Sequence, residues 1–480
     1  MNISTNIKSI QDIMRKDTGI DGDAQRISQM GWMLFLKIYD DSELERELLD
    51  KDYKSLVPDH LKWRNWASDD EGITGDELVE FVNNDLFPAL KDLSAPADSK
   101  ARGLSVREVF ADMFNYMKSG QLLRQVINKI NEIDFNDLKQ RQHFGDIYEK
   151  ILNDLQSAGN SGEYYTPRAV TQFMVDMVDP KLGETLIDPA CGTGGFLANS
   201  IDHIRSRYVK STADEKKLQA SLQGVEKKPL PYVLCVTNML LHNIERPTWV
   251  RHDNTLSRPL RDYGAKDRVD VVITNPPFGG MEEDGIEANF PKAFQTRETA
   301  DLFLVLIMTL LRDGGRAAVV LPDGSLFGEG VKTRIKEKLL TDCNLHTIVR
   351  LPSSVFSPYA SIGTNLLFFT KGEPTEEIWY YQHNVIESQK AYSKTKPIKR
   401  EYLDPIADWW TKREESENAW KVSIKEIEER DFNLDIKNPN EKGAQIGDPV
   451  ALLSELQDSE KDAAQLRGQL KDILTQALTQ

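Results

Sequence analysis

The motif with the clearest chemistry is an asparagine followed by two prolines and a phenylalanine, directly after the apolar predicted strand Val269–Thr274. Two prolines fix the backbone, so the asparagine side chain and a proline carbonyl keep set directions. Acceptors placed on both hydrogens of an exocyclic amino group would localise its lone pair and aim it at an electrophilic methyl group. The phenylalanine ring offers a face on which a planar base or amide can stack. The motif consists of Asn275, Pro276, Pro277 and Phe278.

A glycine-rich loop lies upstream, at the end of one predicted strand and the start of a helix. It reads Asp188-Pro189-Ala190-Cys191-Gly192-Thr193-Gly194-Gly195-Phe196-Leu197. Glycines let backbone N–H groups approach a ligand closely, and a helix N-terminus favours a negative group such as a carboxylate. The loop lacks the G-x-G-x-x-G pattern of a dinucleotide site, which disfavours a nicotinamide oxidoreductase. The less favoured alternatives are a tight strand-to-helix turn for the loop and a proline-stiffened turn for the first motif. A functional site is favoured because the Asn275 motif is expected at the carboxyl edge of the sheet, beside the glycine loop.

Polar residues end the next two predicted strands. Glu226 ends Leu222–Glu226, where an acidic residue can accept both hydroxyls of a ribose. Taken alone, Glu226 would be interpreted as a solvated surface residue. Asp253 and Asn254 follow the third strand, where they could edge an adenine ring or serve as a helix N-cap or turn.

A second stretch of interest, Glu163-Tyr164-Tyr165-Thr166-Pro167-Arg168, precedes a predicted helix. Thr166 at the N-cap and Pro167 at the first helical position are good helix-start chemistry by themselves. The two tyrosines and the small-residue linker before them, 157–162, suggest a ligand lid.

The elements that must position these residues alternate between short β-rich segments and amphipathic helices, which predicts an α/β, doubly wound sheet. The last two strands have few residues between them and are expected to form an antiparallel hairpin at one edge. The pattern suits a seven-stranded methyltransferase-type (Rossmann-like) sheet better than a six-stranded dinucleotide fold. The predicted strands are Thr185–Asp188, Leu222–Glu226, Trp249–Asp253, Val269–Thr274, Arg316–Leu321, Leu345–Leu351, Thr364–Thr370 and Glu377–Gln382.

Helical patterns occupy both ends of the chain. We expect an N-terminal helical bundle over residues 1–158, the sheet domain over 159–405, and a C-terminal region over 406–480 that ends in an amphipathic helix, Asp448–Leu478. The apolar stripe of that helix could fold back on the chain itself or pack against a partner subunit. The predicted N-terminal helices are Ala24–Leu49, Asp76–Leu93, Ser105–Ile130 and Asp134–Leu155.

Composition indicates the cellular compartment and bears on metal and DNA binding. Three scattered cysteines, no secretory signal and no apolar run longer than Leu302–Leu311 predict a cytoplasmic protein without a membrane segment. The seven histidines form no pattern typical of a metal site, so no metal is expected. A net charge of −16 would repel DNA over most directions, so another component would have to supply much of any DNA affinity.

Taken together, these motifs resemble amino-methyltransferases that use S-adenosyl-L-methionine, and most closely the modification subunit of type I restriction–modification systems. The resemblance runs from about residue 8 to 440. It rests on the motifs Gly162–Arg168, Asp188–Phe196 and Asn275–Phe278, and on two further stretches, Gly314–Gly324 and Leu351–Phe356.

The resemblance implies N6-adenine methylation of DNA, with a flipped adenine held by the Asn275–Phe278 motif. It also implies a specificity subunit that selects the target, a restriction subunit, and a second copy of this chain as partners, with double-stranded DNA as substrate. The implied cofactor-binding residues are Glu163, Tyr164, Tyr165, Thr166, Pro167, Arg168, Asp188, Thr193, Gly194, Gly195, Glu226 and Asp253.

Three other functions compete with this interpretation. A methyltransferase acting on glutamine side chains faces the same chemical problem, but usually has tyrosine in place of Phe278. An RNA adenine methyltransferase would be expected to have more basic surface. A non-catalytic assembly subunit with a vestigial site would be expected to alter Asn275 or fill the glycine loop, and the sequence does neither.

Overall fold

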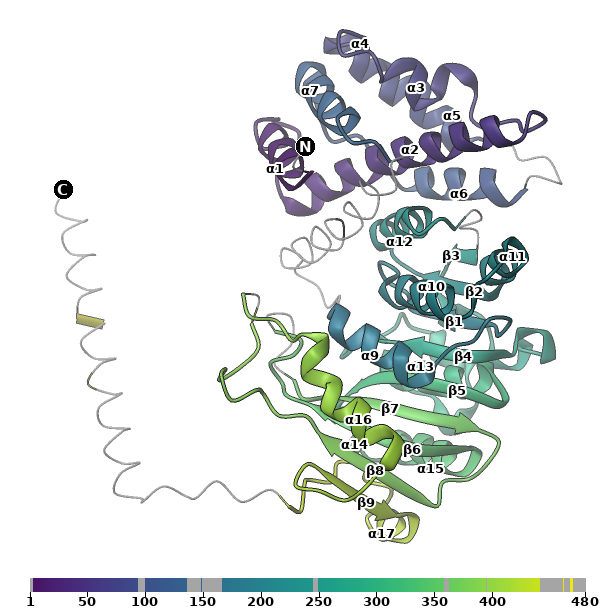
Figure 1. Cartoon of the computed structure of the whole chain (residues 1–480), viewed down its shortest axis with the longest axis vertical. Coiled ribbons are helices and arrows are strands. Elements are labelled where there is room, and N and C mark those ends of the chain that lie inside the picture. The colour runs from purple at the N-terminus through teal and green to yellow at the C-terminus, as the bar shows by residue number, and fades with distance from the viewer. Residues whose placement is uncertain are drawn as a thin grey trace.

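A computed structural model of the chain describes residues 3–93, 100–135, 148, 166–244, 249–357, 362–393, 395–440, 461 and 467–468. Figure 1 shows the N-terminal helices gathered at one end of a central sheet. None of the helices in these ranges is long and apolar enough to cross a membrane.

The central sheet has the strand order β3-β2-β1-β4-β5-β7-β6-β8-β9. Strands β1 to β5 run parallel to one another. Strand β7 is antiparallel to both β5 and β6, β8 is parallel to β6, and β9 is antiparallel to β8. The bounds are β1 Leu186–Asp188, β2 Leu222–Glu226, β3 Val250–His252, β4 Val269–Thr274, β5 Leu311–Pro322, β6 Cys343–Leu351, β7 Thr364–Lys371, β8 Glu377–Gln382 and β9 Ala419–Ser423.

The predicted hairpin of the last two strands is wrong, because β7 lies between β5 and β6 and does not pair with β8. The residues of β7 explain its place. Its first six positions, from Thr364 to Phe369, are all buried, as expected for an interior strand covered on both faces. Strand β8 alternates more and pairs parallel to β6 instead. Among the described residues, the sheet has nine strands, one more than the eight segments predicted, and so exceeds the seven-stranded sheet expected. The additional strand, β9, lies beyond residue 405.

Helices cover both faces of the sheet, so the doubly wound prediction is confirmed. One buried cluster combines α9, α10 and α12 with one set of strand side chains, and the other combines α13 and α15 with the alternate set. The helices of this part are α9 Arg168–Val178, α10 Gly195–Tyr208, α11 Thr212–Ser221, α12 Pro229–Leu241, α13 Thr299–Leu310, α14 Asp323–Phe327, α15 Val331–Asp342, α16 Asp404–Lys412 and α17 Ile424–Glu429.

The N-terminal region is helical, as predicted, and α2 packs against α12 of the sheet domain (Figure 1). Its helices are α1 Ile3–Met14, α2 Asp23–Leu49, α3 Trp63–Trp66, α4 Gly75–Glu80, the π-helical turn Phe81–Leu86, α5 Phe87–Lys91, α6 Lys100–Ala111 and α7 Gly120–Asn131. Short 3-10 turns occupy Asp59–Leu61, Thr255–Ser257, Leu260–Asp262, Ala265–Asp267, Ile286–Asn289, Lys292–Phe294 and Arg400–Leu403.

The predicted single helix Ser105–Ile130 is in fact two helices, α6 and α7, separated by residues 112–119. Side chains from elsewhere take over the hydrogen bonds that a continuous helix would make. The buried carboxylate of Asp17 accepts the backbone N–H groups of Lys118 and Ser119 at 3.0 and 2.9 Å. Ser119 then caps α7 by accepting the N–H of Leu122 at 3.3 Å. Most of the predicted helix Asp134–Leu155, the linker and the C-terminal helix lie outside the described residues.

Candidate functional site

The glycine loop and the Asn275 motif meet at the carboxyl edge of the sheet, because β1 and β4 are neighbouring parallel strands. Between them lies a cavity with an empty volume of about 390 Å³, part of it open to solvent. The cavity is lined by Thr166, Thr171, Asp188, Ala190, Cys191, Gly192, Thr193, Gly195, Phe196 and Asn275. Five of the predicted site residues therefore share one cavity: Thr166, Asp188, Thr193, Gly195 and Asn275.

The carboxamide of Asn275 is held in one orientation. Its Nδ2 donates to the hydroxyl oxygen of Thr166 at 2.8 Å. Its Oδ1 is buried and has no hydrogen-bond partner among the described residues. A buried acceptor without a donor is costly, so its presence beside a cavity marks a place where a donor from a ligand fits. Of the two prolines that follow, Pro276 is buried and Pro277 is exposed.

The glycine loop needs its glycines for conformation and for space. Gly194 has φ +82°, and a Cβ at this position would lie 2.7 Å from Sγ of Cys235. The loop is closed by Gly194 N–H donating to Cys191 O at 2.8 Å. Asn238 on α12 donates to the Thr193 carbonyl at 3.2 Å, which connects the loop to that helix. Helix α10 begins at Gly195, so its N-terminal N–H groups lie at the cavity.

Asp188 joins the ends of the two strands that carry these motifs. Its carboxylate accepts the Thr274 hydroxyl at 2.7 Å and the Ala190 N–H at 3.1 Å. Complete burial raises the pKa of Asp188 to about 7, although these two hydrogen bonds act in the opposite direction. The carboxyl group therefore contributes to the cavity wall and to the alignment of β1 with β4.

Glu226 lies against the glycine loop, whereas the Asp253 side chain is half exposed. The Glu226 carboxylate accepts Gly192 N–H at 2.9 Å and Lys228 N–H at 2.7 Å. The Asp253 N–H donates to the Glu226 carbonyl at 3.0 Å, but its side chain is 50% exposed and lies 3.6 Å from Arg251. Neither residue lines the cavity.

The start of α9 differs from the prediction. Pro167, not Thr166, is the N-cap, and its carbonyl accepts the N–H groups of Val170 and Thr171 at 2.8 and 3.1 Å. Arg168 is the first helical residue. The Thr166 hydroxyl accepts from Asn275 instead of capping the helix. The other predicted residues of this stretch, Glu163, Tyr164 and Tyr165, lie outside the described residues.

The Phe278 ring is 4% exposed and packs edge-on against Phe356, with 6.3 Å between ring centroids and 65° between planes. The face expected to stack on a base is thus covered in this conformation. Phe356 comes from the loop after β6, and sequence reasoning gave it no role in the site. Its only signal was its place in the Leu351–Phe356 stretch.

Sequence reasoning also missed three polar residues on helices behind the loop. Thr171 lines the cavity and accepts from Asn199 Nδ2 at 2.5 Å, and Asn238 holds the Thr193 carbonyl. In the sequence, each of these is a polar residue within an otherwise apolar helical stretch. The sequence alone does not show whether such a residue is buried or exposed to solvent. Within the described ranges, no group of three or more His, Cys, Asp or Glu side chains could hold a metal ion.

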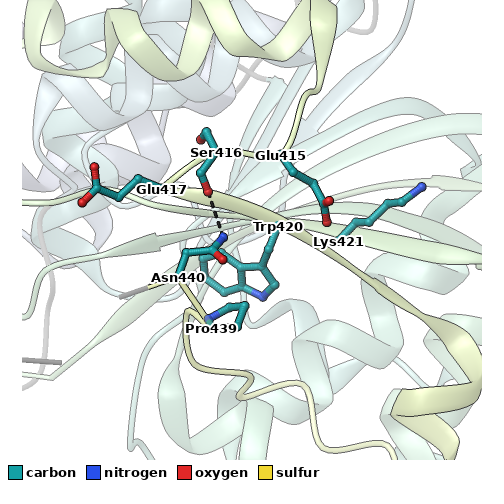
Figure 2. A pocket seen from close by; sticks show the side chains of 7 residues that line it. All are labelled: Glu415, Ser416, Glu417, Trp420, Lys421, Pro439 and Asn440. Carbon is teal, nitrogen blue, oxygen red and sulfur yellow. Dashed lines mark hydrogen bonds between the residues drawn. The ribbon is translucent and has the colours of Figure 1, made fainter. Parts of the chain in front are cut away.

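A second, wider pocket lies at the other end of the sheet, beside the edge strand β9 (Figure 2). Asn440 lines this pocket, and its Nδ2 donates to the Ser416 carbonyl at 2.9 Å. It contains none of the predicted site residues. Its lining consists of Glu415, Ser416, Glu417, Trp420, Lys421, Pro439 and Asn440.

The doubly wound sheet, with a glycine loop and an Asn-Pro-Pro-Phe motif at one carboxyl edge, defines a methyltransferase that acts on amino groups. Comparison with known proteins agrees. The N-6 DNA Methylase family model matches residues 139–446, and the HsdM N-terminal domain model matches residues 3–130. The type I restriction enzyme EcoEI methylase subunit of Escherichia coli is 60% identical over 485 aligned residues, which cover 100% of this chain and 99% of that protein.

Other relatives and solved structures give the same picture. The EcoKI methylase subunit of Escherichia coli K12 is 31% identical, over 79% of this chain and 71% of that protein. The modification subunit of a putative type I restriction enzyme from Vibrio vulnificus YJ016 is 46% identical, with a TM-score of 0.82 over 91% of this chain and 96% of that one. A chain from a structure on complex assembly and conformational transition of the type I R-M system is 34% identical, with a TM-score of 0.81 over 98% of both chains.

The chain therefore belongs to the methylase subunits of type I restriction enzymes, within the N-6 DNA methylase family. It is an enzyme, an N6-adenine DNA methyltransferase of a restriction–modification system. This assignment sets aside the glutamine, RNA and non-catalytic alternatives considered from the sequence.

Proposed function

We propose that this chain transfers a methyl group from S-adenosyl-L-methionine to N6 of an adenine flipped out of duplex DNA in the cytoplasm. The observation that carries the proposal is the buried Oδ1 of Asn275, which has no partner among the described residues and lies beside the glycine-loop cavity. The cavity fits the cofactor because it combines helix N-terminal N–H groups for a carboxylate with the Glu226 carboxylate nearby for a ribose. When bound, S-adenosyl-L-methionine supplies the electrophilic methyl group.

The protein's own residues prepare the amino group. Asn275 Oδ1 and the Pro276 carbonyl accept the two N6 hydrogens, which directs the nitrogen lone pair toward the cavity. Thr166 keeps the carboxamide from rotating, because it accepts from the Asn275 Nδ2. Transfer of the methyl group to N6 would break its bond to the cofactor's sulfur, and the surplus N6 proton would leave to water.

The base needs a stacking surface, and Phe278 provides one once it separates from Phe356. The two rings now contact each other edge to face. Entry of a planar base between them would replace the Phe278–Phe356 contact with base stacking, worth about 1–3 kcal/mol per base. The flipped adenine would thus stabilise the opened arrangement of the rings that it requires.

A substitution at Glu226 tests the proposed binding of S-adenosyl-L-methionine. Replacing Glu226 with alanine should weaken S-adenosyl-L-methionine binding about tenfold to a hundredfold, because the ribose hydroxyls lose a charged acceptor. The same change removes the acceptor of the Gly192 and Lys228 N–H groups. Isothermal titration calorimetry on the full chain measures the effect. Glu401→Gln, at a side chain 63% exposed on the 400–403 turn, is the control and should bind as the wild type does. Unchanged affinity in Glu226→Ala would remove this residue from the site.

We further propose that a specificity subunit, a restriction subunit and a second copy of this chain complete the enzyme, since an acidic chain needs a partner to bring positive surface and base readout. We propose that the apolar stripe predicted for the C-terminal region contacts the specificity subunit. The stripe comprises Leu452, Leu456, Leu466, Leu470 and Ile473. We also propose the domain limits 1–158, 159–405 and 406–480 from the sequence pattern. The last region contributes strand β9 to the sheet, and helix α17 follows that strand.

Deleting residues 448–480 should leave a chain that binds S-adenosyl-L-methionine with wild-type affinity but no longer co-purifies with the specificity subunit. The physical reason is that the stripe has too few apolar partners in its own segment to be buried there. Co-expression of the two subunits, followed by affinity purification and calorimetry, measures both properties. A truncated chain that co-purifies at full stoichiometry would place the interface elsewhere. Loss of cofactor binding would instead indicate that the stripe folds back on its own chain.

A further inference from the structure

A buried carboxylate, Glu282, connects three loops at the carboxyl edge of the sheet. Its side chain is 10% exposed, and its Oε2 accepts Lys227 Nζ at 3.1 Å and Asn254 Nδ2 at 3.2 Å. Lys227 directly follows Glu226 at the end of β2, and Asn254 directly follows Asp253 after β3. Glu282 itself lies on the segment that follows the Asn275–Phe278 motif after β4.

The segment that carries Glu282 is fixed at its base. The Glu282 N–H donates to the Arg297 carbonyl at 3.0 Å, and Met281 forms an antiparallel bridge with Glu298. The Thr299 hydroxyl donates to the Gly280 carbonyl at 2.8 Å. These contacts tie the start of the segment to the start of α13, so the carboxylate is presented from a rigid support.

The two partners of Glu282 are fixed as well. The Asn254 side chain uses its oxygen to accept Leu256 N–H at 3.0 Å, which leaves its Nδ2 for Glu282. A ring nitrogen of His252 lies 3.1 Å from the Lys227 carbonyl, so β3 and the β2 loop are linked a second time. A buried carboxylate is tolerated only when it is paired, and Glu282 is paired with one cation and one amide donor.

Glu283 provides a natural contrast one residue further on. Its carboxylate also lies 3.1 Å from Lys227 Nζ, but its side chain is 77% exposed. An exposed ion pair of this kind contributes little, whereas the loss of a buried partner leaves the other group unsatisfied. The two neighbouring glutamates therefore contact the same lysine in very different surroundings.

We infer that Glu282 is a positioning residue for the cofactor: it holds the Glu226-Lys227 and Asp253-Asn254 loops in register with the segment that follows the catalytic motif. The inference rests on the proposed function, in which Glu226 in the loop after β2 binds the ribose of S-adenosyl-L-methionine, and on the prediction from the sequence that Asp253 and Asn254 edge its adenine. Glu282 is not among the residues that line the glycine-loop cavity. It keeps the two loops at the spacing that the nucleoside half of the cofactor requires.

The test begins with the full-length wild-type chain titrated with S-adenosyl-L-methionine by calorimetry. Absence of binding there would overturn the proposed function itself. With wild-type binding established, Glu282→Gln should raise the Kd about tenfold, since a charged hydrogen-bond partner is lost from two loops. Glu283→Gln is the matched control, because it makes the same chemical change beside the same lysine, and its Kd should stay within about twofold. Equal Kd values for Glu282→Gln and wild type would overturn the inference.

A kinetic measurement separates positioning from a general loss of structure. In the complex assembled with the specificity subunit, Glu282→Gln should raise the KM for S-adenosyl-L-methionine about tenfold while kcat at saturating cofactor changes by less than about threefold. A fall in kcat with unchanged KM would overturn the inference. Should Glu282→Gln not fold, Lys227→Met tests the same contact from a side chain that is 43% exposed. It should also raise the Kd, and a wild-type Kd in that variant would overturn the inference.

Discussion

Replacing Asn275 with alanine should lower methyl transfer by about three orders of magnitude while changing the affinity for S-adenosyl-L-methionine by less than about twofold. The side chain acts on the nucleophile, because its buried Oδ1 has no partner among the described residues and lies beside the cavity. Its removal leaves the N6 lone pair delocalised into the ring, and the cofactor contacts proposed for the glycine loop and Glu226 are unaffected. Transfer of labelled methyl groups by the assembled complex measures the first quantity, and calorimetry on the chain measures the second.

Two further variants identify the cause of the loss. Asn275→Asp keeps an acceptor oxygen and should retain more activity than Asn275→Ala. Thr166→Val removes the hydroxyl that receives Asn275 Nδ2, so the carboxamide can rotate, and kcat should fall about tenfold with the KM for the cofactor little changed. Full activity in Asn275→Ala would refute the mechanism. Equal losses in all three variants would mean that the site had collapsed as a whole.

Much of the fold was predictable because it depends on local patterns. The eight predicted strands all exist, and helices cover both faces of the sheet. What the sequence did not reveal was the order at one end of the sheet, where β7 inserts between β5 and β6. Short connections favour hairpins as a rule, and here the need to bury both faces of Thr364–Phe369 outweighs that preference.

The candidate site divides in the same way. Asn275 and the glycine loop were found because their residue types limit the backbone, which is a local property. The acceptor for Asn275 Nδ2 is Thr166, 109 residues earlier in the chain, and local helix-capping rules assigned that hydroxyl to a different partner. The sequence assigns no role to Glu282, because only the folded chain brings Lys227 and Asn254 to it. Contacts of this kind depend on strand order, so they can be identified only once the fold is known.

Replacing Gly194 with alanine should weaken S-adenosyl-L-methionine binding at least about a hundredfold. Two costs combine at this position. A residue with a Cβ pays about 1–2 kcal/mol for the left-handed backbone, and the φ here is +82°. The new Cβ would also lie 2.7 Å from Cys235 Sγ and 3.3 Å from Met239 Cε, so the loop must shift away from α12 and misalign the N-terminus of α10. Calorimetry on the full chain measures the affinity, and thermal unfolding measures the accompanying loss of stability.

Gly183 is the matched control, because it has φ +94° and a Cβ there would meet no heavy atom within 4 Å. Gly183→Ala should lower the melting temperature through backbone strain yet leave cofactor affinity within about twofold. Adding Cys235→Ala to Gly194→Ala removes the nearest obstructing atom, and affinity should recover by about tenfold, with the backbone cost remaining. Because strain and obstruction are separated in this way, a double variant no better than Gly194→Ala would show that the conformation of the loop, and not its packing on α12, determines cofactor binding.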